Sequence, residues 1–209
     1  MLGQGFADYA PFDTMWPAGT PSLTRVASGE HLFHEGDPVE AIFEIVSGVV
    51  VIYRTSIDGC RLIHDLRFRG ELVGLGYGPT YATGAIAMRP TTLRRISRAA
   101  LERCLDEDPA AVRRLLEAMT LEITRTSDRL MVIGSRTAIG RVATCLLDLS
   151  NRMAGGTDTF ILPISRSQMA DYLGLTVETV SRSMTRLKTL RVIALPRSNT
   201  IVIRDRAEL

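Results

Sequence analysis

Residues 165–190, SRSQMADYLGLTVETVSRSMTRLKTL, constrain the fold of this 209-residue chain more than any other segment. Ser165 is a favourable N-cap, and Gln168 three residues later completes a capping box, which predicts a helix from Arg166 to Leu173. Gly174 follows at once, and glycine readily takes the left-handed conformation that ends a helix. A short helix with both of its ends specified is therefore expected here.

A second helix is expected directly after this glycine, with Thr176 as its N-cap. Its inward positions, at helical spacing, are predicted to be Val177, Val180, Met184 and Leu187. Two short helices joined by a tight glycine turn predict a helix-turn-helix unit. Beyond it, Val192–Leu195 and Thr200–Ile203 flank the turn-forming residues Pro196–Asn199 and predict a two-stranded wing.

Three polar residues share one face near the start of this second helix, because Glu178, Ser181 and Arg182 are spaced at i, i+3 and i+4. A recognition helix meets DNA base edges with that part of its surface. Glutamate accepts a hydrogen bond from cytosine N4, arginine donates to guanine, and serine serves base or backbone. The side chains expected over DNA phosphates are Ser165, Ser167, Thr176, Thr179, Arg186, Lys188, Arg191 and Arg197. The alternative is an intrahelical Glu178–Arg182 ion pair on a solvated face.

The net charge of +2 hides an asymmetry along the chain. Residues 1–134 hold 14 Arg against 17 Asp and Glu, a net charge of −3. Residues 135–209 hold 10 Arg and one Lys against 6 acidic residues, a net charge of +5. A basic C-terminal part indicates contact with a polyanion such as double-stranded DNA, although a chance distribution of few charges would look the same.

The segment from Ser22 to Ser97 alternates apolar and polar residues with frequent glycine turns. Short runs of this kind are typical of an antiparallel β-roll or small barrel. The apolar runs are Ile42–Val46, Val49–Tyr53, Leu62–Leu66 and Leu72–Leu75. Asp58-Gly59 fits a tight hairpin turn, because glycine tolerates positive φ.

A long helix is expected to begin at Asp108-Pro109, since proline is tolerated in a first helical turn. Apolar or small residues then recur at alternating spacings of four and three, which is typical of a two-stranded coiled coil. The predicted seam consists of Val112, Leu116, Met119, Ile123, Thr126, Leu130, Ile133 and Thr137. Flanking Arg and Glu residues leave a narrow apolar stripe, which favours a homodimer over a helix packed on its own domain.

A further helix is expected over Thr137–Met153, ended by Gly155-Gly156, with a short strand over Thr159–Ile164. The predicted domains are a β-roll at 1–107, a dimerisation helix at 108–136 and a winged helix-turn-helix at 137–209. Runs of strands followed by runs of helices place the chain in the α+β class.

The chain resembles the Crp/Fnr family of bacterial transcription regulators over essentially its whole length, most specifically in Leu173–Arg182, LGLTVETVSR. The cyclic AMP-binding members carry Arg-Glu-x-x-Gly-Arg here, whereas this chain has Val177 and Ser181 at the first and fifth positions. The resulting Glu-x-x-Ser-Arg pattern is similar to the Fnr-like and FixK-like branch without the iron–sulfur cluster. The resemblance implies a cyclic-nucleotide-binding-type β-roll, a dimerisation helix and a winged helix-turn-helix.

The same resemblance implies a regulator, not an enzyme, that binds a palindrome close to TTGAT-N4-ATCAA as a homodimer. In the family, the Glu and Arg read the G·C pair of each half-site and the Ser meets adjacent bases or backbone. Those roles fall on Glu178, Arg182 and Ser181. Family habit favours activation, with loops of the β-roll and the winged domain contacting RNA polymerase.

Cyclic AMP is not expected as an effector. Family members that bind it carry a ribose-binding Glu and a phosphate-binding Arg in a cassette that corresponds to residues 70–85 here. Leu75 stands where that Glu should follow Gly74, and Thr83-Gly84-Ala85 replaces the Arg segment. Burying a phosphate without a paired cation is costly. The resemblance to members that need no small effector predicts a dimer competent for DNA without a ligand.

Haem and an iron–sulfur cluster are also not expected. Residues 1–30 contain no cysteine, which removes the ligands of an N-terminal [4Fe–4S] cluster. Gly74 and Gly76 stand near the places where the haem-binding members carry Cys or His. Cys60, just after a hairpin turn, is a candidate redox residue, whereas Cys104 and Cys145 lie in helical patterns and are expected to be packed thiols.

A metal site is not expected either, although His31, His34, Glu35 and His64 could in principle form one on a β-roll. His-x-x-His on a strand should place the two imidazoles on opposite faces. The alternative to a DNA-binding regulator is a cupin-like ligand-binding module or enzyme. That alternative needs a complete metal triad or phosphate cassette, and both are incomplete.

The compartment is expected to be the cytoplasm. Three widely spaced cysteines do not make a disulfide framework. The sequence contains no run of 18 apolar residues, so no transmembrane helix is predicted. The first twenty residues lack the basic and apolar parts of a secretory signal.

Overall fold

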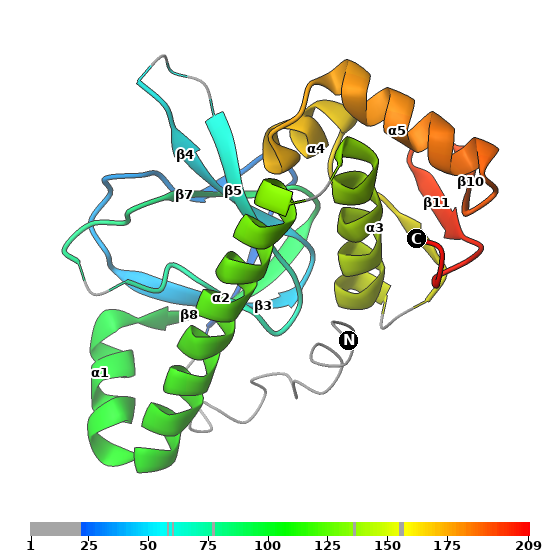
Figure 1. Cartoon of the computed structure of the whole chain (residues 1–209). Helices are drawn as coiled ribbons and strands as arrows, with labels where there is room; N and C mark the ends of the chain where they lie inside the picture. The colour runs from blue at the N-terminus through cyan, green and yellow to red at the C-terminus, as the bar shows by residue number, and fades with distance from the viewer. Residues whose placement is uncertain (1–21, 58, 60, 77, 136, 155–156) are drawn as a thin grey trace. The chain divides into compact units, whose positions relative to one another are not determined.

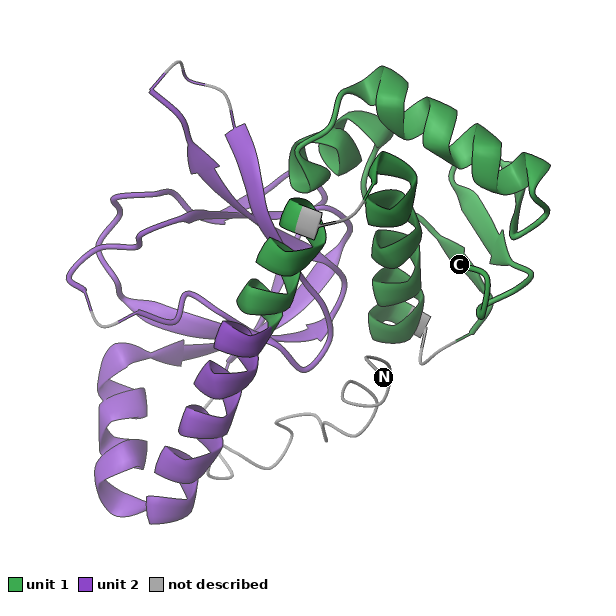
Figure 2. Ribbon diagram, in the orientation of Figure 1, with its two compact units in different colours: residues 1–9, 125–209 green, residues 10–124 purple. Residues whose placement is uncertain are grey.

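The computed structural model describes residues 22–57, 59, 61–76, 78–135, 137–154 and 157–209. The described chain divides into two compact units, one ending at Thr124 and the other beginning at Arg125 (Figure 2). The division falls inside the long helix and not at its start, so the domain boundaries predicted from the sequence stay a prediction. The α+β architecture is confirmed, with strands in the first part of the chain and a helix-turn-helix in the second.

The unit that ends at Thr124, purple in Figure 2, contains two four-stranded antiparallel sheets, with strand orders β1-β8-β3-β6 and β2-β7-β4-β5. The strands are β1 (Ser22–Val26), β2 (His31–Phe33), β3 (Ala41–Ser47), β4 (Val50–Thr55), β5 (Arg61–Arg67), β6 (Leu72–Val73), β7 (Gly84–Ala87) and β8 (Thr91–Ser97). Neighbours in the sheets are mostly distant in sequence, as in a roll. The predicted β-roll is therefore confirmed, with strand bounds within a few residues of the apolar runs.

Apolar side chains from both sheets form the core of this unit, and Ile45, Val50 and Leu93 have no exposed surface. Gly59 has a φ of 77°, as expected for the tight turn between β4 and β5. Asp58 and Cys60, which flank it, lie outside the described residues.

A helix that the sequence analysis left inside the β-roll, α1 (Arg98–Glu107), follows β8. The Ser97 hydroxyl caps it by accepting from the Ala100 amide at 3.2 Å, and Arg98 pairs with Glu102 one turn later at 3.1 Å. The long helix α2 (Pro109–Ser135) then runs in the opposite direction (Figure 1). It begins at the predicted proline.

The predicted seam of α2 is a solvent-exposed stripe. Leu116, Ile123 and Leu130 are 58%, 67% and 67% exposed. Val112, Met119 and Thr126 are also exposed, and Ile133 is half-buried. Most of these apolar side chains are therefore not buried by packing within their own chain.

A different face of α2 packs on the β-roll. Ala118 forms a buried cluster with Leu72 of β6, and Leu115 and Leu75 pack against this cluster. One turn further, Glu122 pairs with the buried guanidinium of Arg67, with 2.5 Å between the carboxylate oxygen and Nη2. The helix thus separates an intrachain face from its exposed seam.

The unit that begins at Arg125, green in Figure 2, contains α3 (Ala138–Ala154), β9 (Thr159–Ile161), α4 (Arg166–Leu173), α5 (Val177–Thr189), β10 (Ile193–Arg197) and β11 (Thr200–Ile203). Helix α3 packs on α5, and its Leu146 and Leu149 are fully buried. The wing is a three-stranded sheet in the order β10-β11-β9. The predicted strand from Thr159 begins as expected but ends at Ile161, because Pro163 follows.

No described helix combines the length and the apolarity that a membrane span needs.

Candidate nucleic-acid interface

Local hydrogen bonds fix the first helix of the predicted helix-turn-helix as the sequence specifies. The Ser165 hydroxyl accepts from the Gln168 amide at 3.2 Å, while the Gln168 side chain accepts from the Ser165 amide at 2.8 Å. Gly174 ends α4 with φ 62° and ψ 45°. The capping box and the left-handed glycine cap are both confirmed, and they direct the chain into α5.

Helix α5 begins at Thr176, whose hydroxyl accepts from the Thr179 amide at 3.2 Å. Val180, Met184 and Leu187 are at most 4% exposed, as predicted. The prediction that Val177 points inward was wrong, since it is 41% exposed. It is the first residue of the helix, and its Cβ tilts toward the N-terminus, where no further turn of this helix lies.

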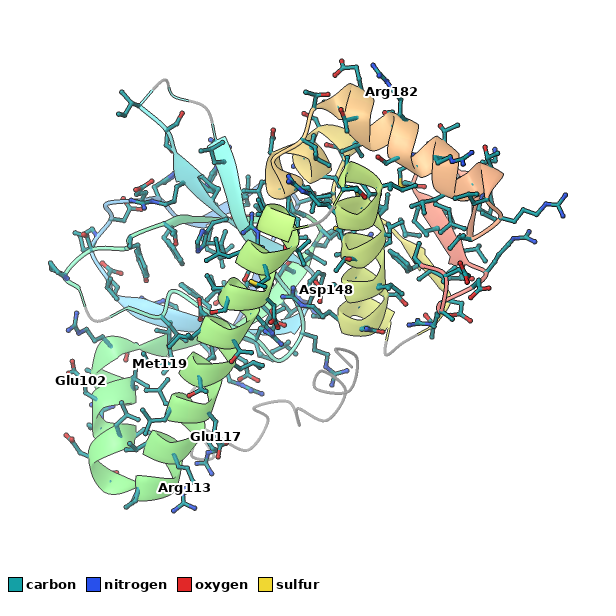
Figure 3. All side chains as sticks on the ribbon, in the orientation of Figure 1. Glu102, Arg113, Glu117, Met119, Asp148 and Arg182 are labelled. Carbon is teal, nitrogen blue, oxygen red and sulfur yellow. The ribbon has the colours of Figure 1, made fainter. Side chains whose placement is uncertain are left out.

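The outer face of α5 presents the three residues predicted to read bases. Glu178, Ser181 and Arg182 are all exposed, and Figure 3 shows Arg182 projecting away from the body of its unit. Spaced at i, i+3 and i+4, they lie together at the N-terminal end of the helix. The structure thus brings the three together on an open surface.

The Glu178 carboxylate is held in its ionised form. Its pKa is lowered, first by its own backbone amide, then by the Thr176 hydroxyl and, as the smallest contribution, by the charge of Arg182. The charge of Arg182 is therefore not the main influence on the pKa of this carboxylate. An ionised carboxylate can accept a hydrogen bond from a cytosine amino group.

Several residues predicted to contact phosphates are exposed on α4, α5 and the wing. Ser165 and Ser167 are exposed at the start of α4, and Arg186 and Lys188 are exposed in the last turn of α5. Arg197 is exposed at the end of β10, next to the wing turn. Their contacts with DNA stay a prediction.

Thr176 and Thr179 are tied to the N-terminus of α5. Thr176 is exposed and Thr179 is half-buried. Their hydroxyl oxygens lie 3.0 Å apart, and that of Thr176 also accepts the Thr179 amide. Part of their hydrogen-bonding capacity is thus used to cap the helix, and this cap orients the first turn that carries Glu178.

Arg191 has an unusual backbone conformation, which the sequence analysis did not predict. Its φ of 61° is the only positive value among the described residues other than glycine. Its amide donates to the Lys188 carbonyl at 3.0 Å, and the Val192 amide donates to the Leu187 carbonyl at 3.1 Å. This is the Schellman arrangement, in which glycine is the usual residue at the position of Arg191.

The cysteines that the structure describes are packed thiols, as predicted. Cys104 and Cys145 are 7% and 5% exposed. Burial raises the pKa of Cys145 to about 12, with a further contribution from Asp148. Cys60, the candidate redox residue, lies outside the described residues, so its role stays a prediction.

The prediction that His31 and His34 lie on opposite faces of a strand was wrong. Strand β2 ends at Phe33, and the two imidazole rings stack with their centroids 4.3 Å apart. Both Nδ1 atoms lie near the Tyr53 hydroxyl, at 3.1 and 3.3 Å. Across the described ranges, no group of three or more His, Cys, Asp or Glu residues is arranged to hold a metal.

Two family models match the chain. The model for the Crp-like helix-turn-helix domain matches residues 140–209, and the model for the cyclic nucleotide-binding domain matches residues 23–108. Together they match a part of each unit and leave residues 109–139 unmatched.

Curated relatives and a solved structure extend this match. The nitrogen fixation regulation protein FixK of Rhizobium meliloti is 36% identical, over 90% of this chain and 85% of that protein. The transcriptional activator protein FnrL of Cereibacter sphaeroides is 31% identical, over 87% of this chain and 76% of that protein. The structure of FixK2 from Bradyrhizobium japonicum has a TM-score of 0.85 and 32% identity, and the match covers 90% of this chain and 95% of that one. The prediction of a regulator, and not an enzyme, is confirmed.

Proposed function

Because the chain belongs to the Crp/Fnr family of DNA-binding transcription regulators, we propose that it activates transcription as a homodimer on a palindromic site, without cyclic AMP. The observation that carries this proposal is the exposed face of α5, where Glu178, Ser181 and Arg182 stand together at the helix N-terminus. The Glu-x-x-Ser-Arg pattern supports a site close to TTGAT-N4-ATCAA, in which Glu178 and Arg182 read the G·C pair of each half-site.

The exposed seam of α2 supports the homodimer. Its apolar residues extend from Val112 to Ile133 at heptad spacing, which is the pattern by which two parallel helices interlock. A stripe of this length left in water would be a liability for a monomer. A dimer would hold two recognition helices about 34 Å apart, the repeat of successive major grooves on one side of DNA.

Two contacts in the β-roll support independence from cyclic AMP. Leu75, where the nucleotide-binding members carry the ribose-binding Glu, packs against the apolar cluster that Leu72 forms with Ala118 of α2. Gly84, in the segment that replaces the phosphate-binding Arg, lies so close to Tyr53 that a Cβ would overlap the phenol ring. The first contact places apolar packing where the ribose would need a carboxylate, and the second closes space in the phosphate cassette.

Activation, and with it contact with RNA polymerase, is proposed from the relatives that are named transcriptional activators. Neither haem nor an iron–sulfur cluster is part of the proposal, and neither is a metal ion. A redox response through Cys60 stays a separate prediction.

The test is binding of the purified, ligand-free protein to a TTGAT-N4-ATCAA duplex and to a scrambled duplex, at about 0.15 M salt, with and without oxygen. Glu178→Ala serves as the matched variant, because it removes one base-reading group and leaves the basic surface intact. We expect tight, specific binding in both atmospheres and a loss of discrimination in the variant. Specific binding that requires added cyclic AMP would refute the effector-independent part, and equal binding to both duplexes would refute the proposed operator.

A further inference from the structure

We propose that Arg129, in the last part of α2, is a positioning residue that fixes the helix-turn-helix to the dimerisation helix. This inference rests on the proposed function, since its consequence is the spacing of two recognition helices in a DNA-bound dimer. It assigns a role to a residue that lies neither in the coiled-coil seam nor on the DNA-facing surface.

Arg129 contacts the C-terminal end of α4 in two ways. Its Nη2 donates to the backbone carbonyl of Tyr172 at 2.9 Å. Its guanidinium carbon also lies 4.2 Å from the centroid of the Tyr172 ring, within the range of a cation–π contact. Tyr172 is only 8% exposed, so both contacts are shielded from water on the tyrosine side. The residue thus combines a directional hydrogen bond with a stacked contact on one partner.

A second arginine reaches the neighbouring carbonyl from another helix. Arg141 of α3 donates through Nη1 to the carbonyl of Leu173 at 3.3 Å. The last carbonyls of a helix lack intrahelical partners and carry partial negative charge, which cations stabilise. Two guanidinium groups, one from α2 and one from α3, therefore hold the end of α4. That end leads directly into Gly174 and the turn before α5.

Arg129 lies in the part of α2 that also carries residues of the proposed dimer seam. Arg129 lies seven residues after Glu122, two helical turns further on the same face, and Glu122 pairs with Arg67 of the β-roll. The seam residues Leu130 and Ile133 lie beside Arg129 in the same turns but on another face. The turns of α2 that would pack in the dimer are thus the turns whose Arg129 contacts Tyr172 of α4.

The expected consequence is a fixed spacing between the two recognition helices. A dimer seam sets the positions of both α2 helices, and Arg129 ties each helix-turn-helix to its own α2. With this tie the dimer should tolerate only one separation of half-sites, because a recognition helix must enter the groove at a set distance from its partner. Without it, the helix-turn-helix should adapt to several separations, with weaker binding to the best one.

The experiment compares wild-type protein with Arg129→Ala and Arg129→Lys, and uses Arg113→Ala as a control that removes the same charge from an exposed position on α2 (Figure 3). Each protein is measured on palindromes with spacers one base pair shorter and longer than the proposed one. Dimerisation is followed by sedimentation. Hydrogen exchange of the segment 166–176 reports the end of α4 directly, whatever the DNA result.

Arg129→Ala should weaken binding to the best palindrome roughly tenfold or more, as for loss of a hydrogen bond to a charged group. It should reduce the penalty for altered spacers and speed exchange at the end of α4, with dimerisation unchanged. Lysine should restore part of each effect, because it keeps the charge and a donor but not the planar stacking. Arg113→Ala should match the wild type.

Two results would overturn the inference. The first is an unchanged spacer profile and unchanged exchange in Arg129→Ala. The second is an equal loss of affinity on every duplex, scrambled DNA included, which would make Arg129 a phosphate contact. If wild-type protein fails to prefer any palindrome, the proposed function fails, and the exchange data alone decide whether Arg129 holds α4.

Discussion

Replacing Arg191 by glycine should stabilise the protein and weaken its binding to DNA. The residue occupies the left-handed position of the Schellman arrangement with φ 61°. This conformation costs a residue with a Cβ about 1–2 kcal/mol. Glycine removes that cost but loses roughly 0.5–1 kcal/mol through its greater freedom in the unfolded chain. The net expected gain is about 0.5–1 kcal/mol. For a unit of this size, that corresponds to a rise in Tm of roughly 2–8 °C at fixed protein concentration.

The same substitution removes an exposed guanidinium between the recognition helix and the wing. If Arg191 contacts one phosphate, affinity should fall by a similar factor on specific and scrambled duplexes. The slope of log Kd against log salt concentration should decrease by about 0.9. The assays are thermal unfolding followed by circular dichroism and DNA titrations over a series of salt concentrations.

Arg191→Ala is the matched control, because alanine removes the guanidinium but keeps the strained backbone. It should reproduce the DNA effect without the gain in Tm. A lower Tm for the glycine variant than for wild type would contradict the assignment of strain. An unchanged salt slope in both variants would show that Arg191 does not touch the DNA backbone.

Four further predictions concern other parts of the molecule. Arg182→Ala should lose about 1–3 kcal/mol of binding free energy on the palindrome and relax base preference, whereas Lys188→Ala should weaken binding to all duplexes alike. Equal losses of affinity on specific and scrambled DNA for Arg182→Ala would contradict base reading. Ile123→Asp should shift sedimentation from dimer to monomer without unfolding the chain, because this 67% exposed side chain has its expected partner in a second copy. Burial, His34 and Arg61 lower the pKa of His31 below its usual 6.5. The stability that the neutral imidazole contributes is therefore complete above pH 6.5 and is lost as the pH falls through the lowered pKa. His31→Gln should flatten this acid-side decline in Tm, and parallel curves of Tm against pH for the variant and the wild type would contradict the prediction. Cys145, with a pKa of about 12, should resist a thiol reagent at about pH 8 until denaturant is added, which mass spectrometry of labelled peptides can follow.

The features that the sequence predicted best are those that short-range chemistry decides. Ser165, Gln168 and Gly174 specify both ends of α4 within ten residues, and the structure follows them. The exposed seam of α2 was likewise readable from its period, because apolar residues at heptad spacing between charged neighbours are typical of a coiled-coil helix. The grouping of Glu178, Ser181 and Arg182 on the outer face of α5 was predictable from their i, i+3 and i+4 spacing.

The features that the sequence analysis missed depend on tertiary context or on where an element ends. Strand β2 stops before His34, so the rule of alternating faces did not apply, and the His31 and His34 rings stack. Helix α1 has local signals in its N-cap Ser97 and in the Arg98–Glu102 pair, but the sequence analysis placed this segment inside the β-roll. The contact of Arg129 with Tyr172 joins residues 43 positions apart, and no local pattern marks it.

In the proposed homodimer, the separation of the two faces of α2 would make the choice of dimer partner independently adjustable. Residues from Val112 to Ile133 on the seam can be rewritten as an orthogonal coiled-coil pair, while Leu115, Ala118, Glu122 and Arg129 keep their places on the other face. Two such variants in one cell would each assemble only with their own kind. With different recognition helices they would form parallel regulatory channels, and with complementary seams they would form obligate heterodimers that address asymmetric operators.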